Sequence, residues 1–395
     1  MFLGEELHYD RKNNINYDVI IIGSGIIGTN IAYELSKFEL KIALLEAKKY
    51  PASETTTGNS GIIHCGFDPS PGKLKAKFNV LGHKLWTENI FKKIIFPRQK
   101  AKSVVLAFDS EEEKIIYDLY KRGIINGLDP KNLSILSKKE LKLAHPDVSE
   151  EAVLALECLN SWVVDPVKAA YAFLEISRKN GLEFFSSSKV ISISKNSQNF
   201  FLIKTENQNN PFFQSKIIIN AAGHYADEIG KIAGFGEFSQ KQRRGQYLIL
   251  KNHPNIKNIY FLVPSKYGKG VIVAPRPDGN ILVGPTAKEN ISKNKVNCLD
   301  FDLNEEIQKI GHKIIPSLDY SETVFALAGS RPIEAEKSDF VIKPAFNDPN
   351  FIFAAGMQSP GLSASPAIAL EIVNFVKNRI DLVKKTELVE TIEYI

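Results

Sequence analysis

The feature that most constrains the fold is a glycine turn close to the N-terminus. The apolar, β-branched run YDVIII at 17–22 leads directly into GSGIIG at 23–28, and a helical pattern of apolar residues follows over 29–40. A further strand-like run, KIALLEA, occupies 41–47. Strand, glycine turn, helix and strand in this order form a βαβ unit, so the sequence predicts the first strands of a parallel sheet here.

The three glycines of this turn have the spacing G-x-G-x-x-G. Gly23 permits a tight turn, Gly25 lets the backbone approach a pyrophosphate, and Gly28 lets the helix pack closely against the strand. The phosphates of a dinucleotide would then meet the N-terminus of the helix. Glu46, 18 residues after Gly28, is placed to bind a ribose hydroxyl, and an acidic residue there favours FAD or NAD over NADP.

Two later turns distinguish between these dinucleotides. INAAGHYAD at 219–227 and AAGMQSPGLSASPA at 354–367 each follow an apolar strand-like run, and both are expected to return to the first sheet. A nicotinamide enzyme does not need such closing segments around its N-terminal motif, whereas a large, permanently held flavin does. FAD is therefore the favoured cofactor.

Consecutive strands without helices between them indicate a second kind of layer. Between 245 and 288 the runs GQYLIL, IYFLVP, GVIVAP and NILVGP are separated by turn residues such as PDGN, which predicts a mostly antiparallel sheet. We predict an α/β fold: an FAD-binding, Rossmann-like doubly wound sheet with an interleaved, mostly antiparallel β-sheet substrate domain. The predicted segments are 1–98, 162–233 and 331–395 for the FAD-binding domain, and 99–161 and 234–330 for the substrate (cap) domain.

Composition excludes several classes of function. The 50 Lys and Arg against 45 Asp and Glu give a net charge of +5, which is too small for a nucleic-acid-binding protein but suits a small anionic ligand. The three widely spaced cysteines, Cys65, Cys158 and Cys298, predict neither a disulfide framework nor a metal site, and they indicate a reducing compartment.

Membrane and export signals are also not expected. The apolar runs are shorter than the roughly 18 residues that a spanning helix requires. Residues 1–16 are polar and lack the apolar core of a signal peptide. We therefore expect a cytoplasmic protein without a transmembrane segment and with a loosely held N-terminal extension; peripheral contact with a membrane is left open.

Taken together, these residues resemble the flavoprotein oxidoreductases of the D-amino-acid oxidase superfamily, in particular its 2-hydroxy-acid and glycerol 3-phosphate branch. Within that branch the chain is similar to the compact glycerol 3-phosphate oxidases of wall-less bacteria. The resemblance spans residue 17 to about residue 370. It is carried by the N-terminal turn and by LLEAKKY, ETTTGNSGIIHCGFDP, FPRQK, SWVVDP, AAGHYAD, RRGQY, YGKGVIVAP, LVGPTA, AGSRPI and SPGLSASPAIA.

The resemblance implies an oxidation of sn-glycerol 3-phosphate by oxygen, giving dihydroxyacetone phosphate and hydrogen peroxide. The first alternative keeps the flavin and takes an L-2-hydroxy acid such as 2-hydroxyglutarate, because flavoenzymes for that substrate share the NSG…H segment. A second alternative, from a different class, is a dinucleotide-binding protein without oxidase activity that serves as a binding module.

His64, in NSGIIHCG at 59–66, is the candidate catalytic residue. Oxidation of a secondary alcohol requires a base that takes the hydroxyl proton, and imidazole titrates near neutral pH. The residue pattern alone leaves a structural role open, and it is the resemblance that assigns His64 to catalysis. His224 is expected to pack or hydrogen bond near the second turn. The remaining histidines are predicted to be surface or helix residues: His8, His83, His145, His253 and His312.

Recognition of a phosphate requires fixed cations or forked donors. Lys269 lies between two glycines in YGKGV, and Arg331 follows what reads as the end of a small-residue strand in AGSRPI. The resemblance assigns both to the substrate anion, together with Ser359 and Ser60. From the residues alone, a solvated surface charge stays open as the alternative for each cation.

The same resemblance assigns a larger set of residues to the cofactor. They come from the glycine turn, the end of the second strand, the hydroxyl-rich segment and the later small-residue turns. The predicted cofactor residues are Gly23, Gly25, Ile26, Ile27, Gly28, Glu46, Thr56, Thr57, Asn59, Ser60, Gly61, Ile62, Val190, Ala221, Ala222, Gly223, Gly329, Pro360, Gly361 and Leu362.

Overall fold

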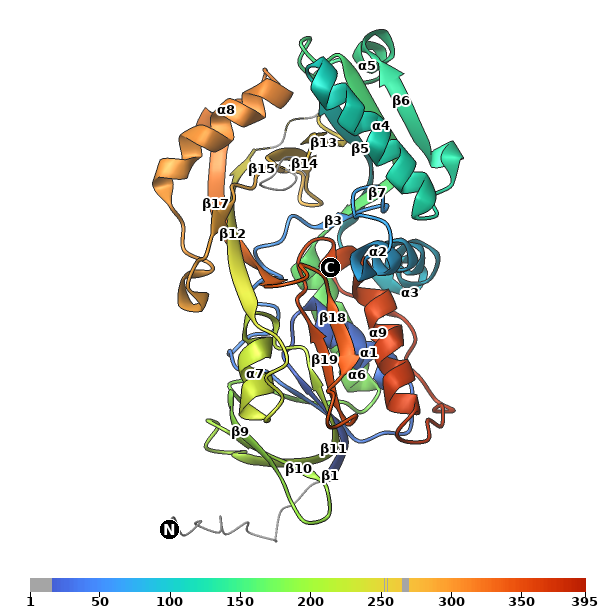
Figure 1. The fold of residues 1–395 in the computed structure, drawn as a ribbon, viewed down its shortest axis with the longest axis vertical. Coiled ribbons are helices and arrows are strands. Elements are labelled where there is room, and N and C mark those ends of the chain that lie inside the picture. The colour runs from blue at the N-terminus through green and yellow to red at the C-terminus, as the bar shows by residue number, and fades with distance from the viewer. Residues whose placement is uncertain (1–15, 252, 254, 265–269) are drawn as a thin grey trace.

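The computed structural model of the chain describes residues 16–251, 253, 255–264 and 270–395. Two sheets occupy successive positions along the long axis of the molecule (Figure 1). Residues 1–15 of the predicted N-terminal extension lie outside the described part of the chain, and its last residue, Asn16, is the first residue of strand β1 (Asn16–Ile22). None of the helices in the described residues is both long enough and apolar enough to cross a bilayer.

The first sheet is built on parallel strands that are buried on both faces. Strand β1 pairs in parallel with β2 and β11, and β11 pairs in parallel with β19, so these strands end at one edge of the sheet. Their near-continuous apolar sequences are typical of parallel strands covered on both sides. The strands of the main path, in spatial order, are β18 (Val341–Pro344), β19 (Phe351–Ala355), β11 (Phe212–Asn220), β1 (Asn16–Ile22), β2 (Ile42–Leu45) and β8 (Glu183–Phe185).

Helices cover one face of this sheet, and a β-ribbon with a short helix covers the other. The helical layer consists of α1 (Ile26–Leu35), α6 (Pro166–Lys179) and α9 (Gly361–Lys377). The opposite layer consists of β9 (Val190–Lys195), β10 (Phe201–Thr205) and α7 (Ala226–Ile232). Successive side chains of a strand point to opposite faces of the sheet. Val19 and Ile21 of β1 therefore pack under the helices, and Ile20 and Ile22 pack on the ribbon side.

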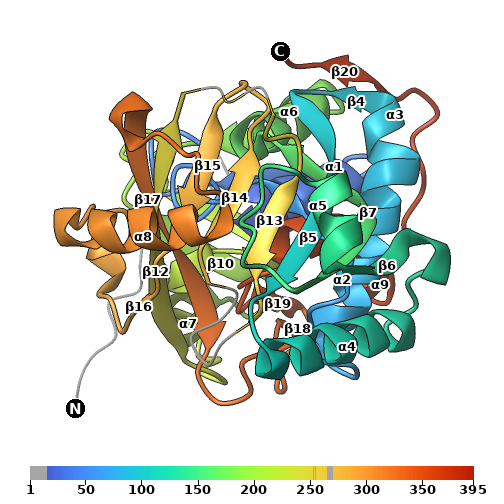
Figure 2. The ribbon, with the colours of Figure 1, turned by 90° about the horizontal axis from the view of Figure 1, so that it is seen from above.

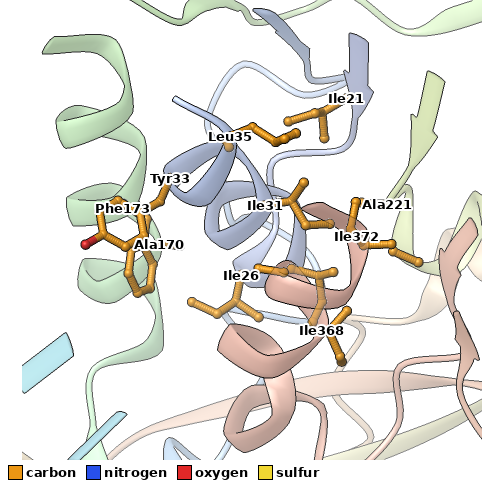
Figure 3. Close-up of a cluster of buried hydrophobic side chains, with 14 of the residues drawn as sticks. Ile21, Ile26, Ile31, Tyr33, Leu35, Ala170, Phe173, Ala221, Ile368 and Ile372 are labelled. Carbon is orange, nitrogen blue, oxygen red and sulfur yellow. The ribbon is translucent and has the colours of Figure 1, made fainter. Parts of the chain in front are cut away.

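Helix α1 lies between α6 and α9 (Figure 3). Tyr33 contacts Phe173 of α6 with ring centroids 5.4 Å apart, and Ile31, which has no exposed surface, belongs to the same apolar cluster as Ile368 of α9. Gly28 makes the close approach of α1 to the sheet feasible, because a Cβ atom there would lie 1.9 Å from the carbonyl oxygen of Gly23. The prediction that Gly28 lets the helix pack closely against the strand is thus confirmed.

The second sheet is mostly antiparallel, as predicted, with one parallel pair between β13 and β5. Helices α4 (Ser110–Ile125) and α8 (Asn304–Ile314) lie at this end of the molecule (Figures 1 and 2). The strands of this sheet are β3 (Ile62–Ile63), β5 (Arg98–Ala107), β6 (Leu133–Ser137), β7 (Leu154–Val164), β12 (Gln240–Leu250), β13 (Ile259–Leu262), β14 (Ile272–Pro275), β15 (Ile281–Gly284), β16 (Lys288–Glu289) and β17 (Thr323–Glu334).

Short elements complete the fold outside the two sheets. They lie mainly between β3 and β5, beside β6 and near the C-terminus. They are α2 (Leu74–Leu85), a π-helical turn (Trp86–Ile90), α3 (Phe91–Lys93), β4 (Ile94–Ile95), α5 (Lys138–Ala144) and β20 (Ile392–Glu393), together with five single-turn 3-10 helices of three residues each in the described part of the chain, such as the one over Gly223–Tyr225.

The predicted fold class is confirmed, with two differences in detail. Strand β3 belongs to the second sheet although it lies in the segment 1–98, and β7 and β17 run across the positions where we expected one domain to give way to the other. The exact domain boundaries therefore stay a prediction. The chain passes from one sheet region to the other within long strands and not in linkers. A search of the sequence for turn residues does not detect such transitions.

His145 was expected at the surface or in a helix, and this expectation is wrong. It follows the last residue of α5 and is only 2% exposed. Its Nε2 lies 2.9 Å from Glu157 Oε2, and its Nδ1 lies 3.2 Å from the hydroxyl of Tyr260. The buried carboxylate also accepts a hydrogen bond from Lys102 Nζ at 2.9 Å. These partners on β5, β7 and β13 are distant in sequence, so local polarity gave no sign of the burial.

We predict that Gly28→Ala destabilises the fold by about 3 kcal/mol, because the added carbon collides with rigid backbone. The matched control is Gly25→Ala, whose Cβ would meet Thr56 Oγ1 at 3.4 Å, an ordinary contact. Urea unfolding of both variants without added ligand measures the difference. Equal midpoints for the two variants would contradict the close helix–strand packing.

Candidate active site

A cavity of about 580 Å³ opens at the edge where β1, β11 and β19 end. This volume lies within the roughly 300–1,000 Å³ of small-molecule and cofactor sites. Its wall contains residues of all three small-residue turns, of the hydroxyl-rich segment, and of β12 and β17 from the second sheet. The predicted convergence of three distant turns is therefore present, and the second sheet closes the cavity from the other side.

The N-terminus of helix α1 faces this cavity, and its N-cap residue has no side chain that could cap the helix. Gly25 is the N-cap residue and makes no side-chain hydrogen bond to the helix end. The backbone N–H of Ile26 donates to Thr56 Oγ1 at 3.1 Å, and Gly25, Ile26 and Ile27 line the cavity. The N–H groups at a helix N-terminus and the helix dipole together bind anions, so this end of the cavity suits a pyrophosphate.

Glu46 holds the glycine turn in place from the end of β2. Its Oε2 accepts hydrogen bonds from the backbone N–H of Ser24 at 2.9 Å and from the Ser24 hydroxyl at 2.6 Å. Its Oε1 accepts from the backbone N–H of Lys48 at 2.8 Å. Glu46 also lines the cavity, so a single carboxylate both orders the turn and remains available to a ribose hydroxyl.

Residues 54–58, which we name the threonine loop, connect three parts of the chain. Thr55 Oγ1 lies 2.8 Å from His224 Nε2 next to the second turn, and Thr56 Oγ1 accepts from the start of α1. Gly58 lies against Gly329 of β17, where a Cβ on Gly58 would be 2.2 Å from the Gly329 Cα atom. The loop thus brings the second sheet into contact with the predicted phosphate site.

His64 lies just beyond the short strand β3 and lines the cavity. β3 pairs with β7, and the backbone N–H of His64 donates to Ser363 Oγ of α9 at 2.7 Å. The imidazole lies beside Phe261 of β13, with ring centroids 6.0 Å apart. The second sheet and helix α9 therefore fix the position of this residue at the cavity wall.

Arg331 and Tyr247 line the cavity from neighbouring strands β17 and β12. Burial lowers the pKa of the Arg331 guanidinium, which is the expected effect of removing a cation from water. Burial likewise raises the pKa of the Tyr247 phenol, while the charge of Arg331 and a side-chain hydrogen bond with Ser60 act in the opposite direction. Arg331 lies within β17, so our placement of it after a strand end is wrong.

Most of the predicted site residues line the same cavity. Gly28, Thr57 and Gly61 do not line it: Gly28 packs α1 on the sheet, Thr57 donates to the carbonyl of Ala52 at 2.6 Å, and Gly61 has φ +72° against Val164. Lys269 lies outside the described residues. The predicted residues that line the cavity are Gly23, Gly25, Ile26, Ile27, Glu46, Thr56, Asn59, Ser60, Ile62, His64, Val190, Ala221, Ala222, Gly223, Gly329, Arg331, Ser359, Pro360, Gly361 and Leu362. Their individual roles stay predictions.

Several wall residues were missed because they come from the second sheet. Tyr247, Phe261 and Ile272 face the cavity from β12, β13 and β14. Each lies in a strand that was predicted, but the sequence gives no sign of which face of those strands meets the cofactor domain. A sequence signal for Tyr247 is present in the motif RRGQY, which combines this aromatic residue with a glycine that permits close packing.

A family profile described as "FAD dependent oxidoreductase" matches residues 18–374. The chain belongs to this family. Members of the family bind FAD, and the cavity has the features that this cofactor needs: an uncapped helix N-terminus, an acidic residue at the end of the second strand and small-residue turns that admit a planar ring system. FAD is therefore the cofactor of this flavoprotein.

The chain is also similar to individual proteins over most of its length. The flavoprotein is 45% identical over 361 residues to the glycerol 3-phosphate oxidase of Mycoplasma genitalium, covering 91% of this chain and 94% of that protein. It is similar, with a TM-score of 0.93 and 40% identity, to a solved structure of dithionite-reduced L-alpha-glycerophosphate oxidase from Mycoplasma pneumoniae with FAD bound, covering 96% and 99% of the two chains. The mitochondrial L-2-hydroxyglutarate dehydrogenase of Nematostella vectensis is 29% identical over 315 residues, covering 75% of this chain and 68% of that protein.

We predict that Glu46→Gln raises the dissociation constant of FAD about 10-fold, because hydrogen bonds to a charged acceptor are replaced by weaker or misdirected ones. Titration of the FAD-free protein with FAD, followed by quenching of flavin fluorescence, measures the change. Glu39→Gln, at an exposed position between α1 and β2, is the control that should bind FAD like the parent protein. Unchanged affinity in Glu46→Gln would remove this carboxylate from the cofactor site.

Proposed function

We propose that the protein oxidises sn-glycerol 3-phosphate with oxygen, giving dihydroxyacetone phosphate and hydrogen peroxide. The observation that carries the proposal is that one cavity is lined both by the dinucleotide turn and by an imidazole and a guanidinium, His64 and Arg331. In this proposal the imidazole provides the base and the guanidinium binds the anion. Oxidation of a phosphorylated alcohol requires both functions. Similarity to the Mycoplasma genitalium glycerol 3-phosphate oxidase supports the choice of substrate.

In this proposal His64 is the general base. Bound FAD would supply the acceptor for the hydride equivalent of the substrate carbon and the route for its two electrons to oxygen. In this role a ring nitrogen of His64 takes the proton that the hydroxyl loses, so that a carbon–oxygen double bond can form. The hydrogen bond from the His64 backbone to Ser363 limits movement of the imidazole, which keeps the base aligned between turnovers.

Arg331 is the proposed anchor for the substrate phosphate. Its guanidinium presents several N–H donors in a fixed plane that matches phosphate oxygens. Ser60 and Ser359 line the same cavity, and Tyr247 lies close enough to Arg331 for the charge to affect the phenol. These hydroxyls add donors around the anion, and Lys269, outside the described residues, is proposed as a second cation.

An L-2-hydroxy acid is the second candidate substrate, since an L-2-hydroxyglutarate dehydrogenase is among the relatives. Both substrates are anionic secondary alcohols, so His64 serves either one. We favour the phosphate because the relative with 45% identity is named for glycerol 3-phosphate, against 29% for the hydroxyglutarate enzyme. We also propose that the protein acts in the cytoplasm, on the basis of its composition and its few, widely spaced cysteines.

The direct test is a spectrum of the purified protein under nitrogen. Addition of glycerol 3-phosphate should bleach the flavin absorption band, and admission of air should restore it with formation of hydrogen peroxide. L-2-hydroxyglutarate at the same concentration should leave the band unchanged. Bleaching by the hydroxy acid alone would reverse the assignment of substrate, and bleaching by neither would favour a binding module.

We predict that His64→Asn slows anaerobic bleaching by glycerol 3-phosphate at least about 100-fold, because general-base catalysis contributes roughly that factor or more. FAD content should not change, since the backbone hydrogen bond to Ser363 is retained. Stopped-flow absorbance measures the rate. His312→Gln, on the exposed face of α8, is the control. A bleaching rate equal to that of the parent protein would exclude His64 as the base.

We predict that Arg331→Gln raises the KM for glycerol 3-phosphate on the order of 100-fold, because a charge-assisted contact to the phosphate is lost. The rate measured with uncharged glycerol should be the same in the variant as in the parent protein, since glycerol offers no anion. Arg276→Gln, in the hairpin between β14 and β15, removes a guanidinium that pairs with Asp278 and should change neither parameter. Equal losses for glycerol and glycerol 3-phosphate would indicate a structural role for Arg331.

A further inference from the structure

His224 is a buried imidazole that the proposed reaction does not use. It is 1% exposed and follows the second small-residue turn in the single helical turn Gly223–Tyr225. Its Nδ1 lies 2.6 Å from Gln242 Oε1 on β12, and its Nε2 lies 2.8 Å from Thr55 Oγ1 in the threonine loop. The ring therefore joins a strand of the second sheet to a loop that borders the cofactor cavity.

The two contacts define the protonation state of the ring. Gln242 Oε1 can only accept, so Nδ1 carries a hydrogen, and a neutral imidazole then has an acceptor at Nε2. Thr55 must donate its hydroxyl hydrogen to that nitrogen. Gln242 is 3% exposed, and its Nε2 has no hydrogen-bond partner among the described residues. The contact with His224 is thus what stabilises this buried amide.

The contact with Thr55 extends to the phosphate site through the neighbouring residue. Thr56, which is 5% exposed, accepts a hydrogen bond from the backbone N–H of Ile26 at the start of α1. Thr55 and Thr56 are adjacent in a short loop, and Gly58 packs on Gly329 at the other end of that loop. Thr55 and Thr56 thus connect His224 Nε2 to a backbone N–H group at the cavity end of α1.

We propose that neutral His224 is a positioning residue for FAD: it holds the threonine loop in the conformation that binds the cofactor, and protonation of the ring releases that loop and weakens FAD binding. The reason is that a protonated ring carries hydrogens on both nitrogens and cannot accept from Thr55. Two donors would then face each other at 2.8 Å in a buried site. The proposal depends on FAD binding and not on which alcohol is oxidised.

The surroundings of His224 determine the direction of the pH effect. Burial lowers the pKa of the imidazole and is the largest influence; Gln242, Glu54 and Asp227 oppose it, and Lys293 adds to it. Lys293 is paired with Asp227 at 2.6 Å on the side of α7. The ring has the lower pKa while it is buried against the ordered threonine loop. In this proposal FAD affinity is therefore fully present above the ordinary histidine value of about 6.5 and is lost as the pH falls below it.

The test measures FAD release from the holoenzyme between about pH 7.5 and about pH 5, the range in which histidine titrates and most carboxylates do not. Ultrafiltration followed by flavin fluorescence gives the dissociation constant without any alcohol substrate. We expect the dissociation constant of FAD in the parent protein to rise at least about 5-fold as the pH falls through this range, as the loss of one buried hydrogen bond predicts. A failure of the proposed oxidase activity would leave this measurement unaffected.

Three variants separate positioning from simple packing. His224→Gln can offer Thr55 an amide oxygen that does not titrate, so it should bind FAD within about 3-fold of the parent protein at the upper pH and show little pH dependence. Thr55→Val removes the donor and should weaken binding about 5-fold at the upper pH, again without pH dependence. His312→Gln, on exposed α8, should keep the profile of the parent protein.

The result that would overturn the proposal is a pH profile in His224→Gln that matches the parent protein. The same profile in Thr55→Val would also overturn it, since the titrating ring would then act on something other than the threonine loop. Thermal unfolding of each FAD-free variant at both pH limits distinguishes these outcomes from a general loss of the fold, because the proposal expects FAD affinity to change by more than stability does.

Discussion

The site depends on the parallel pairing of β1 with β11 and of β11 with β19. In this register Ile22 lies opposite Asn220, and Asn220 lies opposite Phe353, so three turns that are far apart in the sequence leave the sheet at one edge. Parallel neighbours must be joined by long crossovers, and here the crossovers include much of the second sheet. The cofactor site and the substrate sheet are therefore assembled together.

The threonine loop connects the two sheets across this edge. The glycine pair Gly58 and Gly329 lets the loop approach β17 more closely than any side chain would permit. From there, hydrogen bonds run to α1 through Thr56 and to β12 through His224 and Gln242. The electrostatic character of the cavity follows from this arrangement: the N-terminus of α1 attracts phosphates on one side, and Arg331 on β17 supplies a cation from the other.

Sequence reasoning predicted the features that are local or repeated. The glycine turn, the helix after it and the small-residue turns before His224 and Ser359 were predictable because backbone geometry dictates their residue types. The contacts between sheets were not, since Tyr247 faces the cavity through the register of β12 with β17, and that register is not encoded by nearby residues. The same reason explains why the partners of the buried His145 were not predicted.

The most direct test of this account is a crystal structure of the holoenzyme with dihydroxyacetone phosphate bound. The account predicts the FAD pyrophosphate at the N-terminus of α1, the isoalloxazine ring beside His64, and a ring nitrogen of His64 within about 3 Å of the ligand carbonyl oxygen. The phosphate of the ligand should contact Arg331. An imidazole that points away from the flavin, or a pyrophosphate bound elsewhere than at α1, would contradict it.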